Sequence, residues 1–184
     1  MSSDPTPGTS IPARVTVEEL ASATGVPLDE VQALISARGE PSSPDDLVGA
    51  ELALSVGRAL GVPIAIEPRD LALEHLYQIE LGGDTTDVAD MTGRVGFLVR
   101  GVLDNKEELD HEIESASEHW SVARMPVIDR SILRLGLFEL SHSTDTPTAV
   151  VVSEAVRLAR IYSTEKSGAF VNGVLAALAR AIRS

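Results

Sequence analysis

Apolar side chains recur along this chain at intervals of three and four residues, the spacing that places them on one face of an α-helix. Ile128, Ile132 and Leu135 show it clearly and predict a helix over residues 126–141. The sequence contains no sustained alternation of apolar and polar residues, which is the pattern of a half-buried strand. We therefore predict an all-α protein.

The region from residue 67 onward is expected to hold six helices. Gly82 and Gly83 end the first of them, Pro147 opens the fifth, and Ser163 is a candidate N-cap for the sixth. The predicted ranges are 69–81, 85–103, 104–119, 126–141, 147–162 and 163–182.

The residues before this region predict a smaller group of helices. Thr16 and Glu19 form a T-x-x-E capping box at the start of the first helix, and Gly25 ends it. Pro27 opens a second helix, and Ser43 can cap a third. We accordingly expect a disordered tail over 1–13, a small acidic helical module with its linker over 14–66, and a helical domain over 67–184.

Composition supports this architecture and narrows the class of protein. Apolar residues make up 43% of the 184 residues and aromatic residues only 3%, a balance that favours close-packed helices over a β-sandwich. Cysteine is absent, which excludes disulfides and thiolate metal sites. The first ten residues contain no apolar run, and no apolar stretch is long enough for a membrane span. We therefore expect a cytoplasmic protein.

The net charge of −13 argues against a general nucleic-acid-binding protein, but the charge is unevenly distributed. Residues 1–66 carry 3 basic and 9 acidic groups, and residues 67–118 carry 4 basic and 14 acidic groups. Residues 119–184 carry 8 basic and 5 acidic groups. Only this last third can present a basic face to phosphates.

The sequence lacks the usual patterns of catalytic and metal sites. Its four histidines do not have the spacing of metal ligands, and the acidic stretch over 107–114 lacks the glycine of a calcium loop. There is no glycine-rich phosphate loop and no G-x-S-x-G elbow. We expect a binding protein with no enzymatic activity, cofactor or metal.

Three blocks in the last third carry a family resemblance, and the segment Leu76-Tyr77-Gln78-x-Glu80 agrees with it. In this order and spacing they resemble the NusB family of bacterial transcription antitermination factors, over residues 67–182. The blocks are WSVARMPVIDRSILRLGLFEL (120–140), PTAVVVSEAVRLA (147–159) and SGAFVNGVL (167–175).

The resemblance implies two packed three-helix bundles and a binding function. Family members pair with NusE, a small-subunit ribosomal protein, and the pair holds single-stranded boxA RNA of ribosomal-RNA leader transcripts. The complex helps RNA polymerase to pass terminators. Homodimers occur in the family, and a homodimer is compatible with this sequence. The implied site residues are Arg69, Arg124, Arg130, Lys166 and Phe170 for RNA, and Tyr77 and Asp129 for the partner or RNA.

Each of these residues also has a structural interpretation. Phe170 shares a helical face with core positions, Tyr77 can be a half-buried packing ring, and Asp129 can be a helix N-terminal carboxylate. Arg130 can bind phosphate, whereas Arg134 is expected to pair with nearby acidic groups such as those of the acidic third helix. Both interpretations stay open at this stage.

Two alternatives to antitermination follow from departures and neighbours of the pattern. Family members usually have several arginines just upstream of Arg69, where this chain has Ile66, Glu67 and Pro68, and each lost phosphate contact should weaken RNA binding. The chain can therefore be a NusB-fold scaffold that has lost RNA binding. It can also be the RNA-binding part of a ribosomal-RNA methyltransferase system, since such enzymes carry a NusB-like domain.

The N-terminal module lies outside this resemblance. The segment from Val15 to Gly25, with Gly39 and Ser43, weakly resembles the small helical module at the N-terminus of bacterial translation initiation factor two. Asp29 and Glu30 make its second helix unsuitable for a DNA groove. We expect a protein-docking module, with nucleic-acid contact or a structural extension as the alternatives.

Overall fold

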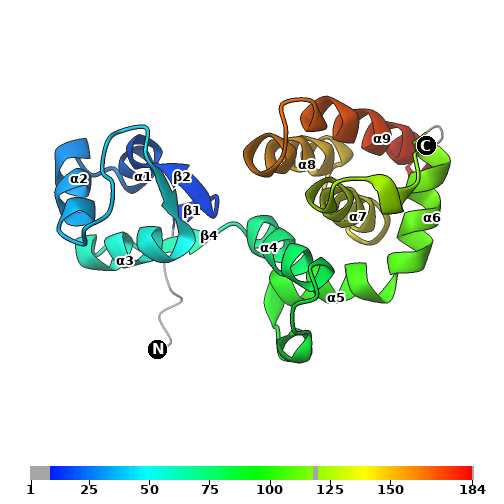
Figure 1. The fold of residues 1–184 in the computed structure, drawn as a ribbon, viewed down its shortest axis with the longest axis horizontal. Coiled ribbons are helices and arrows are strands. Elements are labelled where there is room, and N and C mark those ends of the chain that lie inside the picture. The colour runs from blue at the N-terminus through cyan, green and yellow to red at the C-terminus, as the bar shows by residue number, and fades with distance from the viewer. Residues whose placement is uncertain (1–8, 118–119, 184) are drawn as a thin grey trace. The chain divides into compact units, whose positions relative to one another are not determined.

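The computed structural model describes residues 9–117 and 120–183, which fold as two compact units that divide between Asp70 and Leu71 (Figure 1). We had placed this division after residue 66. It falls later because the backbone N–H of Ala13 donates to the buried carboxylate of Asp70 at 3.2 Å, which ties the first helical turn to the N-terminal unit.

The N-terminal unit contains four three-residue strands, which the helical pattern did not predict. Their shortness explains this, because three residues are too few to establish an alternation of period two. Residues 9–11, which we had assigned to a disordered tail, form the first strand. The pairs are β1 (Thr9–Ile11) with β4 (Ile64–Ile66) in parallel, and β2 (Arg14–Thr16) with β3 (Leu47–Gly49) in antiparallel orientation.

Helix α1 of this unit begins where the capping box predicted it. The Thr16 Oγ1 accepts from the Glu19 N–H at 3.1 Å, and the Glu19 carboxylate accepts from the Thr16 N–H at 2.7 Å. Gly25 ends the helix with a φ of 70°, in the left-handed region that glycine adopts without strain. The three helices are α1 (Val17–Thr24), α2 (Leu28–Ser36) and α3 (Ala50–Leu60).

Helix α3 begins seven residues later than the candidate N-cap Ser43 suggested. The Ser43 N–H donates to the Asp46 carboxylate at 2.7 Å, so the residues between them form a turn and not a helix. The next three residues then pair with β2. Tertiary pairing has overridden the local N-cap signal here. The buried side chains that hold the unit together include Val17, Leu20, Val31, Ile35 and Val56.

The second unit has the six predicted helices, and the all-α class is confirmed for it. The fifth expectation that changes is the start of α5, because a 3-10 turn at Thr86–Val88 and Gly93, with a φ of 64°, occupy the preceding residues. The last two residues of the predicted range 104–119 lie outside the described residues. The helices are α4 (Pro68–Glu80), α5 (Gly93–Asp104), α6 (Lys106–Ala116), α7 (Val127–His142), α8 (Thr148–Tyr162) and α9 (Ser167–Ile182).

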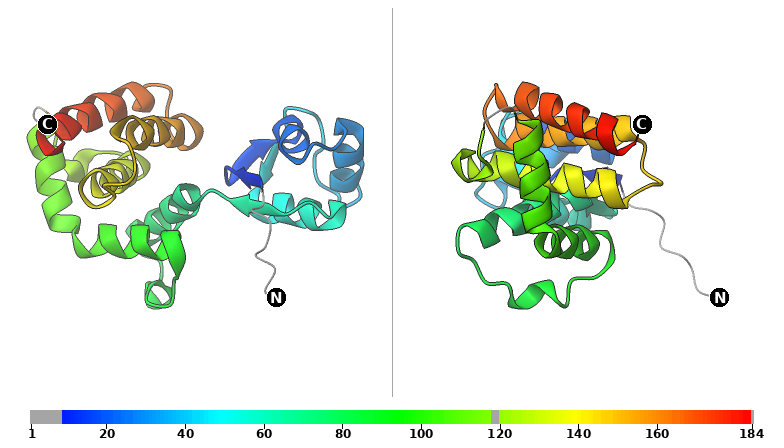
Figure 2. Two further views of the ribbon diagram at one scale, coloured as in Figure 1. Left: turned by 180° about the vertical axis from the view of Figure 1, so that it is seen from behind. Right: turned by 90° about the vertical axis from the view of Figure 1, so that its right-hand side faces the viewer.

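Helix α7 is the centre of this unit. It packs against α8 and α9 in one three-helix bundle, and α5 and α6 pack against it from the other helical group (Figures 1 and 2). All residues of α7 from Ser131 to Leu140 are buried, as expected for a helix surrounded by others. The close approach of α5 requires Gly101, because a Cβ there would lie 1.9 Å from the Cζ of Phe138.

Arg183 fastens the end of α9 to the end of α7. Its guanidinium donates to the backbone carbonyls of Glu139, Leu140 and Ser143 at 2.8–3.1 Å, and to that of Thr146 at 2.6 Å. A planar guanidinium with five donors suits such a cluster of carbonyls at a helix C-terminus. In the described part of the chain, no helix is long and apolar enough to cross a membrane.

Candidate functional site

The start of α7 and the segment that joins α8 to α9 are held together by Asp129. One oxygen of this buried carboxylate accepts from the hydroxyl of Ser163, and the other accepts from the hydroxyl of Ser167 at 2.9 Å. Ser167 also contacts the hydroxyl of Thr164 at 2.8 Å. Ser163 therefore does not cap α9, as its position suggested, but fixes the α8–α9 segment to α7.

Phe170 lies one turn into α9, next to this junction. Its side chain is half-buried and packs against the core, and its ring also contacts Trp120, with 6.4 Å between the ring centroids and an interplanar angle of 52°. Trp120 itself is 59% exposed. Both sequence interpretations of Phe170 are thus compatible with its position, since one edge packs inward and the other contacts a surface ring.

Two exposed cations accompany the aromatic pair along the chain. Lys166 precedes α9, and its carbonyl accepts from the Phe170 N–H, which places the two residues one helical turn apart on the same side. Arg124 ends the 3-10 turn Val122–Arg124 that follows Trp120. Within residues 9–117 and 120–183, neither cation is in an ion pair. Both are therefore free to meet negative charge.

Arg130, by contrast, belongs to an ion-pair network between α4 and α7. Its guanidinium donates to the Glu80 carboxylate at 2.7 and 2.8 Å, and its side chain is only 18% exposed. Arg134 contacts the same carboxylate at 3.0 Å and binds Asp110 of α6 at 2.6 and 2.9 Å. The expectation that Arg134 pairs with the acidic third helix is confirmed. Lys106 completes the network at 3.3 Å from Glu80.

These cations determine the ionisation of Glu80. Burial by itself raises the pKa of this carboxyl, but the charge of Arg134, the hydrogen bond from Arg130 and the charge of Lys106 outweigh it. The pKa of Glu80 is consequently held below its ordinary value of 4.5. The network is therefore fully charged at neutral pH, and Glu80 offsets much of the positive charge that α7 would otherwise show.

The remaining predicted site residues lie on α4. Arg69 is half-buried in its first turn, and Tyr77 is half-buried near its end. Tyr77 and Glu80 are three residues apart on the helix, so the phenol side chain and the ion-pair network are neighbours. No group of three or more His, Asp or Glu side chains within the described ranges has the arrangement of a metal site.

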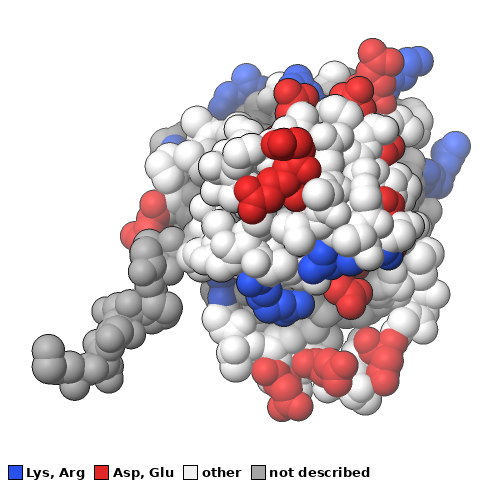
Figure 3. Space-filling view, turned by 90° about the vertical axis from the view of Figure 1, so that its left-hand side faces the viewer, with Lys and Arg blue, Asp and Glu red and all other residues white. Residues whose placement is uncertain are grey.

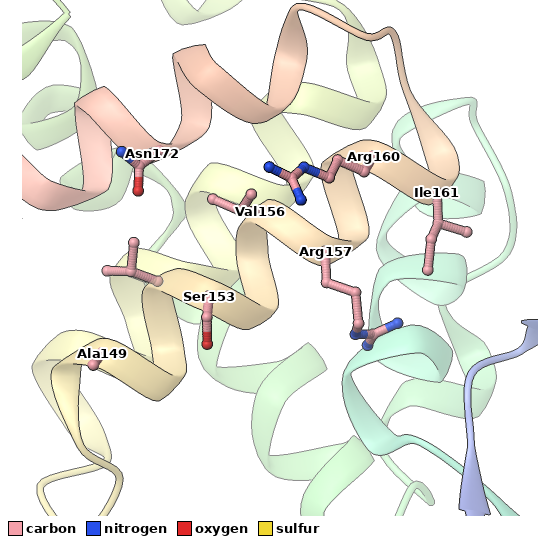
Figure 4. A pocket seen from close by; sticks show the side chains of 8 residues that line it. Ala149, Ser153, Val156, Arg157, Arg160, Ile161 and Asn172 are labelled. Atoms are coloured by element: carbon pink, nitrogen blue, oxygen red, sulfur yellow. The ribbon is translucent and has the colours of Figure 1, made fainter.

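A shallow groove of about 570 Å³ runs between α8 and α9 (Figure 4). Arg160 reaches across it toward α9 and covers Gly168, where a Cβ would lie 3.3 Å from the Arg160 Cγ. Arg157 bonds to Glu154 at 3.1 Å. Figure 3 shows another face of the molecule, where carboxylates form several separate groups with basic side chains between them. The groove is lined by Ala149, Val152, Ser153, Val156, Arg157, Arg160, Ile161 and Asn172.

Sequence reasoning did not select Trp120 as a site residue, although it quoted the residue within a motif. The available signal was a single tryptophan in a chain with 3% aromatic residues, in the loop just before α7. Its contact with Phe170 joins residues that are far apart in the sequence, and no local pattern reveals such a pairing.

The fold and this surface define an all-helical double-bundle domain with an exposed aromatic and cationic site at the α7–α9 junction. The model of the NusB family matches residues 66–180, which is more than half of the chain. The chain belongs to the NusB family.

Named relatives agree with this assignment. The chain is 38% identical over 125 residues to the transcription antitermination protein NusB of Leifsonia xyli subsp. xyli, which covers 67% of this chain and 87% of that protein. It is 39% identical over 120 residues to the protein of the same name from Listeria monocytogenes, covering 61% and 94%. The N-terminal unit lies almost entirely outside the family match.

Solved structures show the same fold. Thermotoga maritima NusB superimposes with a TM-score of 0.53 and 31% identity, covering 61% of this chain and 88% of that structure. A crystal structure of the antitermination factors NusB and NusE in complex with double-stranded RNA gives a TM-score of 0.52 with 31% identity, covering 62% and 94%. The predicted double bundle is thereby confirmed for the family domain.

Proposed function

We propose that this chain is a transcription antitermination factor that binds a NusE-type ribosomal protein and boxA-like leader RNA. The observation that carries the proposal is the pair of unpaired cations, Lys166 and Arg124, beside Phe170 on a NusB-family domain. Single-stranded RNA is bound by cations that meet phosphates and by aromatic rings that meet bases. The structure of related NusB and NusE proteins with RNA supports partners of both kinds.

The residues implied in RNA binding take different roles in this proposal. Lys166 and Arg124 contact phosphates directly, and Phe170 contacts a base. Arg130 acts indirectly, because Glu80 already neutralises it and because its side chain is only 18% exposed. Arg69, in the first turn of α4, supplies a further cation where relatives have several.

For the protein partner, Tyr77 is the direct contact on α4, where its phenol group is half-exposed. Asp129 supports recognition without touching the partner, because its buried oxygens already accept from Ser163 and Ser167. It keeps the segment before Lys166 in place. The assembly forms in the cytoplasm, around RNA polymerase, and the protein acts by binding and not by catalysis.

A scaffold that binds the NusE-type protein but no RNA is the second candidate. Its supporting observation is the Glu80 network, which removes Arg130 and Arg134 from the free positive charge of α7. The acidic N-terminal unit, with its own core, is in either case a docking module for another protein. Its resemblance to the initiation-factor module supports this role.

Titration of the full-length protein with labelled boxA-like RNA separates the two candidates. An antitermination factor should gain RNA affinity when the NusE-type protein is present. Its log affinity should fall linearly with log salt concentration, at about 0.7 per phosphate contact on single strands. NusE binding without RNA binding would identify the scaffold. A shuffled RNA of the same length measures the non-specific contribution.

A further inference from the structure

Trp120 is the only tryptophan in the chain, and it is 59% exposed. A tryptophan side chain has a large apolar surface, and folding normally removes much of it from water. The residue also lies in a family domain whose other large side chains fill the core densely. Its exposure therefore suggests that a ligand covers the ring.

The backbone at Trp120 is anchored and does not form a free loop tip. The hydroxyl of buried Ser117 donates to the Trp120 carbonyl at 2.9 Å, and the Trp120 N–H donates to the Ser117 carbonyl at 3.3 Å. The Glu114 carboxylate accepts from the hydroxyl of Ser121 at 3.0 Å and from the N–H of Val122 at 2.9 Å. These bonds connect the residue to the end of α6.

The contact with Phe170 supports the indole without covering it. The rings are 6.4 Å apart and tilted by 52°, so they meet edge to face and leave most of the indole surface open. Two anchored rings of this kind form a corner in which a flat aromatic group can be held. Lys166 and Arg124 stand beside the two rings in the sequence and carry unpaired positive charge.

We propose that Trp120 and Phe170 form a stacking platform for one unpaired base of an RNA strand, with the indole as the main stacking surface. This inference rests on the proposed function and names a contact within it. An unpaired nucleotide combines a flat π-surface with a negative phosphate, which matches two rings accompanied by free cations. An apolar protein surface would match the rings but would leave Lys166 and Arg124 without partners.

Intrinsic fluorescence tests the platform directly, because all tryptophan emission of this chain comes from Trp120. BoxA-like single-stranded RNA should quench the emission, with the same dissociation constant that anisotropy of the labelled RNA gives. A strand of equal length with abasic positions keeps the phosphates but has no bases to stack. It should bind more weakly and should not quench.

Variants of the full-length protein give a second readout. Trp120→Ala should weaken RNA binding roughly 5- to 150-fold, the range expected for the loss of one stacked base. Trp120→Phe should restore most of the affinity. The slope against salt should not change, because no phosphate contact is removed. Leu81→Ala removes an apolar side chain that is 57% exposed elsewhere and is the matched control. Circular dichroism verifies that the variants fold.

The outcomes distinguish failure of this inference from failure of the proposed function. RNA binding by the wild type without quenching, and with equal affinity of Trp120→Ala, would overturn the platform and leave the proposed function intact. Loss of NusE binding but not of RNA binding in Trp120→Ala would show that the ring contacts a protein, and would also overturn it. Absence of RNA binding by the wild type, with and without NusE, would overturn both.

Discussion

The hydroxyl of Ser167, the first residue of α9, donates to the carboxylate of Asp129 in the first turn of α7 at 2.9 Å. The same carboxylate accepts from Ser163 at the end of α8. One buried acidic side chain thus joins the three helices of the C-terminal bundle at the end that carries Lys166 and Phe170. The surface proposed to bind RNA depends on this internal contact.

Asp129→Ala should therefore destabilise the protein and weaken RNA binding together. A hydrogen bond to a charged group contributes about 1.5–3 kcal/mol, and the variant leaves two hydroxyls without their acceptor. We expect a loss of about 2 kcal/mol or more in the free energy of unfolding, measured with urea. Exposed Asp145→Ala is the matched control and should change the stability little. Equal stability of the two variants would contradict the role given to Asp129.

Gly101 and Gly173 should respond in opposite ways to alanine. At Gly101 a Cβ would lie 1.9 Å from Phe138, so Gly101→Ala should cost about 1–3 kcal/mol through overpacking. Gly173 lies in α9 with open space around its Cα, so Gly173→Ala should stabilise the protein by up to about 1 kcal/mol. Thermal unfolding of both variants measures the contrast. A stabilising Gly101→Ala would show that α5 and α7 can separate without cost.

Removal of the Arg183 side chain should loosen the end of the C-terminal bundle. The guanidinium donates to four backbone carbonyls, and Arg183→Ala would leave those carbonyls without this donor. We expect a loss of about 2–3 kcal/mol in the free energy of unfolding, since hydrogen bonds from charged groups are the stronger ones. Arg180→Ala, at an exposed position of the same helix, serves as the control. Similar urea midpoints for the two variants would argue against the clamp.

Glu80 should make the stability depend on pH in the acidic range. Its pKa is lowered in the folded state, so the unfolded chain takes up the proton first as the pH falls. The stabilisation is therefore complete above the ordinary value of 4.5 and is lost as the pH falls through the lowered folded pKa. Stability curves from pH 7 to pH 3 should be flatter for Glu80→Gln than for the wild type. Exposed Glu74→Gln should retain the wild-type slope.

Lys166 and Arg130 should differ in their effect on RNA binding. Lys166→Ala should weaken the binding and lower the salt slope by about 0.7, because one phosphate contact on a single strand is lost. Arg130→Ala should destabilise the fold, since it leaves part of the Glu80 charge unpaired, but it should leave the salt slope unchanged. Arg58→Ala, in the N-terminal unit, controls for net charge. Equal slopes for Lys166→Ala and the wild type would remove Lys166 from the RNA surface.

The sequence by itself determined the helices of the family domain and the start of α1. Helical periodicity is a local property, and the capping box joins Thr16 to Glu19 over only three residues, so both can be read without the fold. The separated motifs around α7, α8 and α9 likewise identified the family and its double bundle.

The tertiary structure alone decided the features that depend on distant residues. Strands of three residues exist only because β4 and β3 supply their partners, and α3 starts late for the same reason. Arg130 and Lys166 are both cations in the sequence, yet only the packing of α4 on α7 places Glu80 beside the first and leaves the second free. Trp120 gains its meaning from Phe170, because through-space contacts have no counterpart in local pattern.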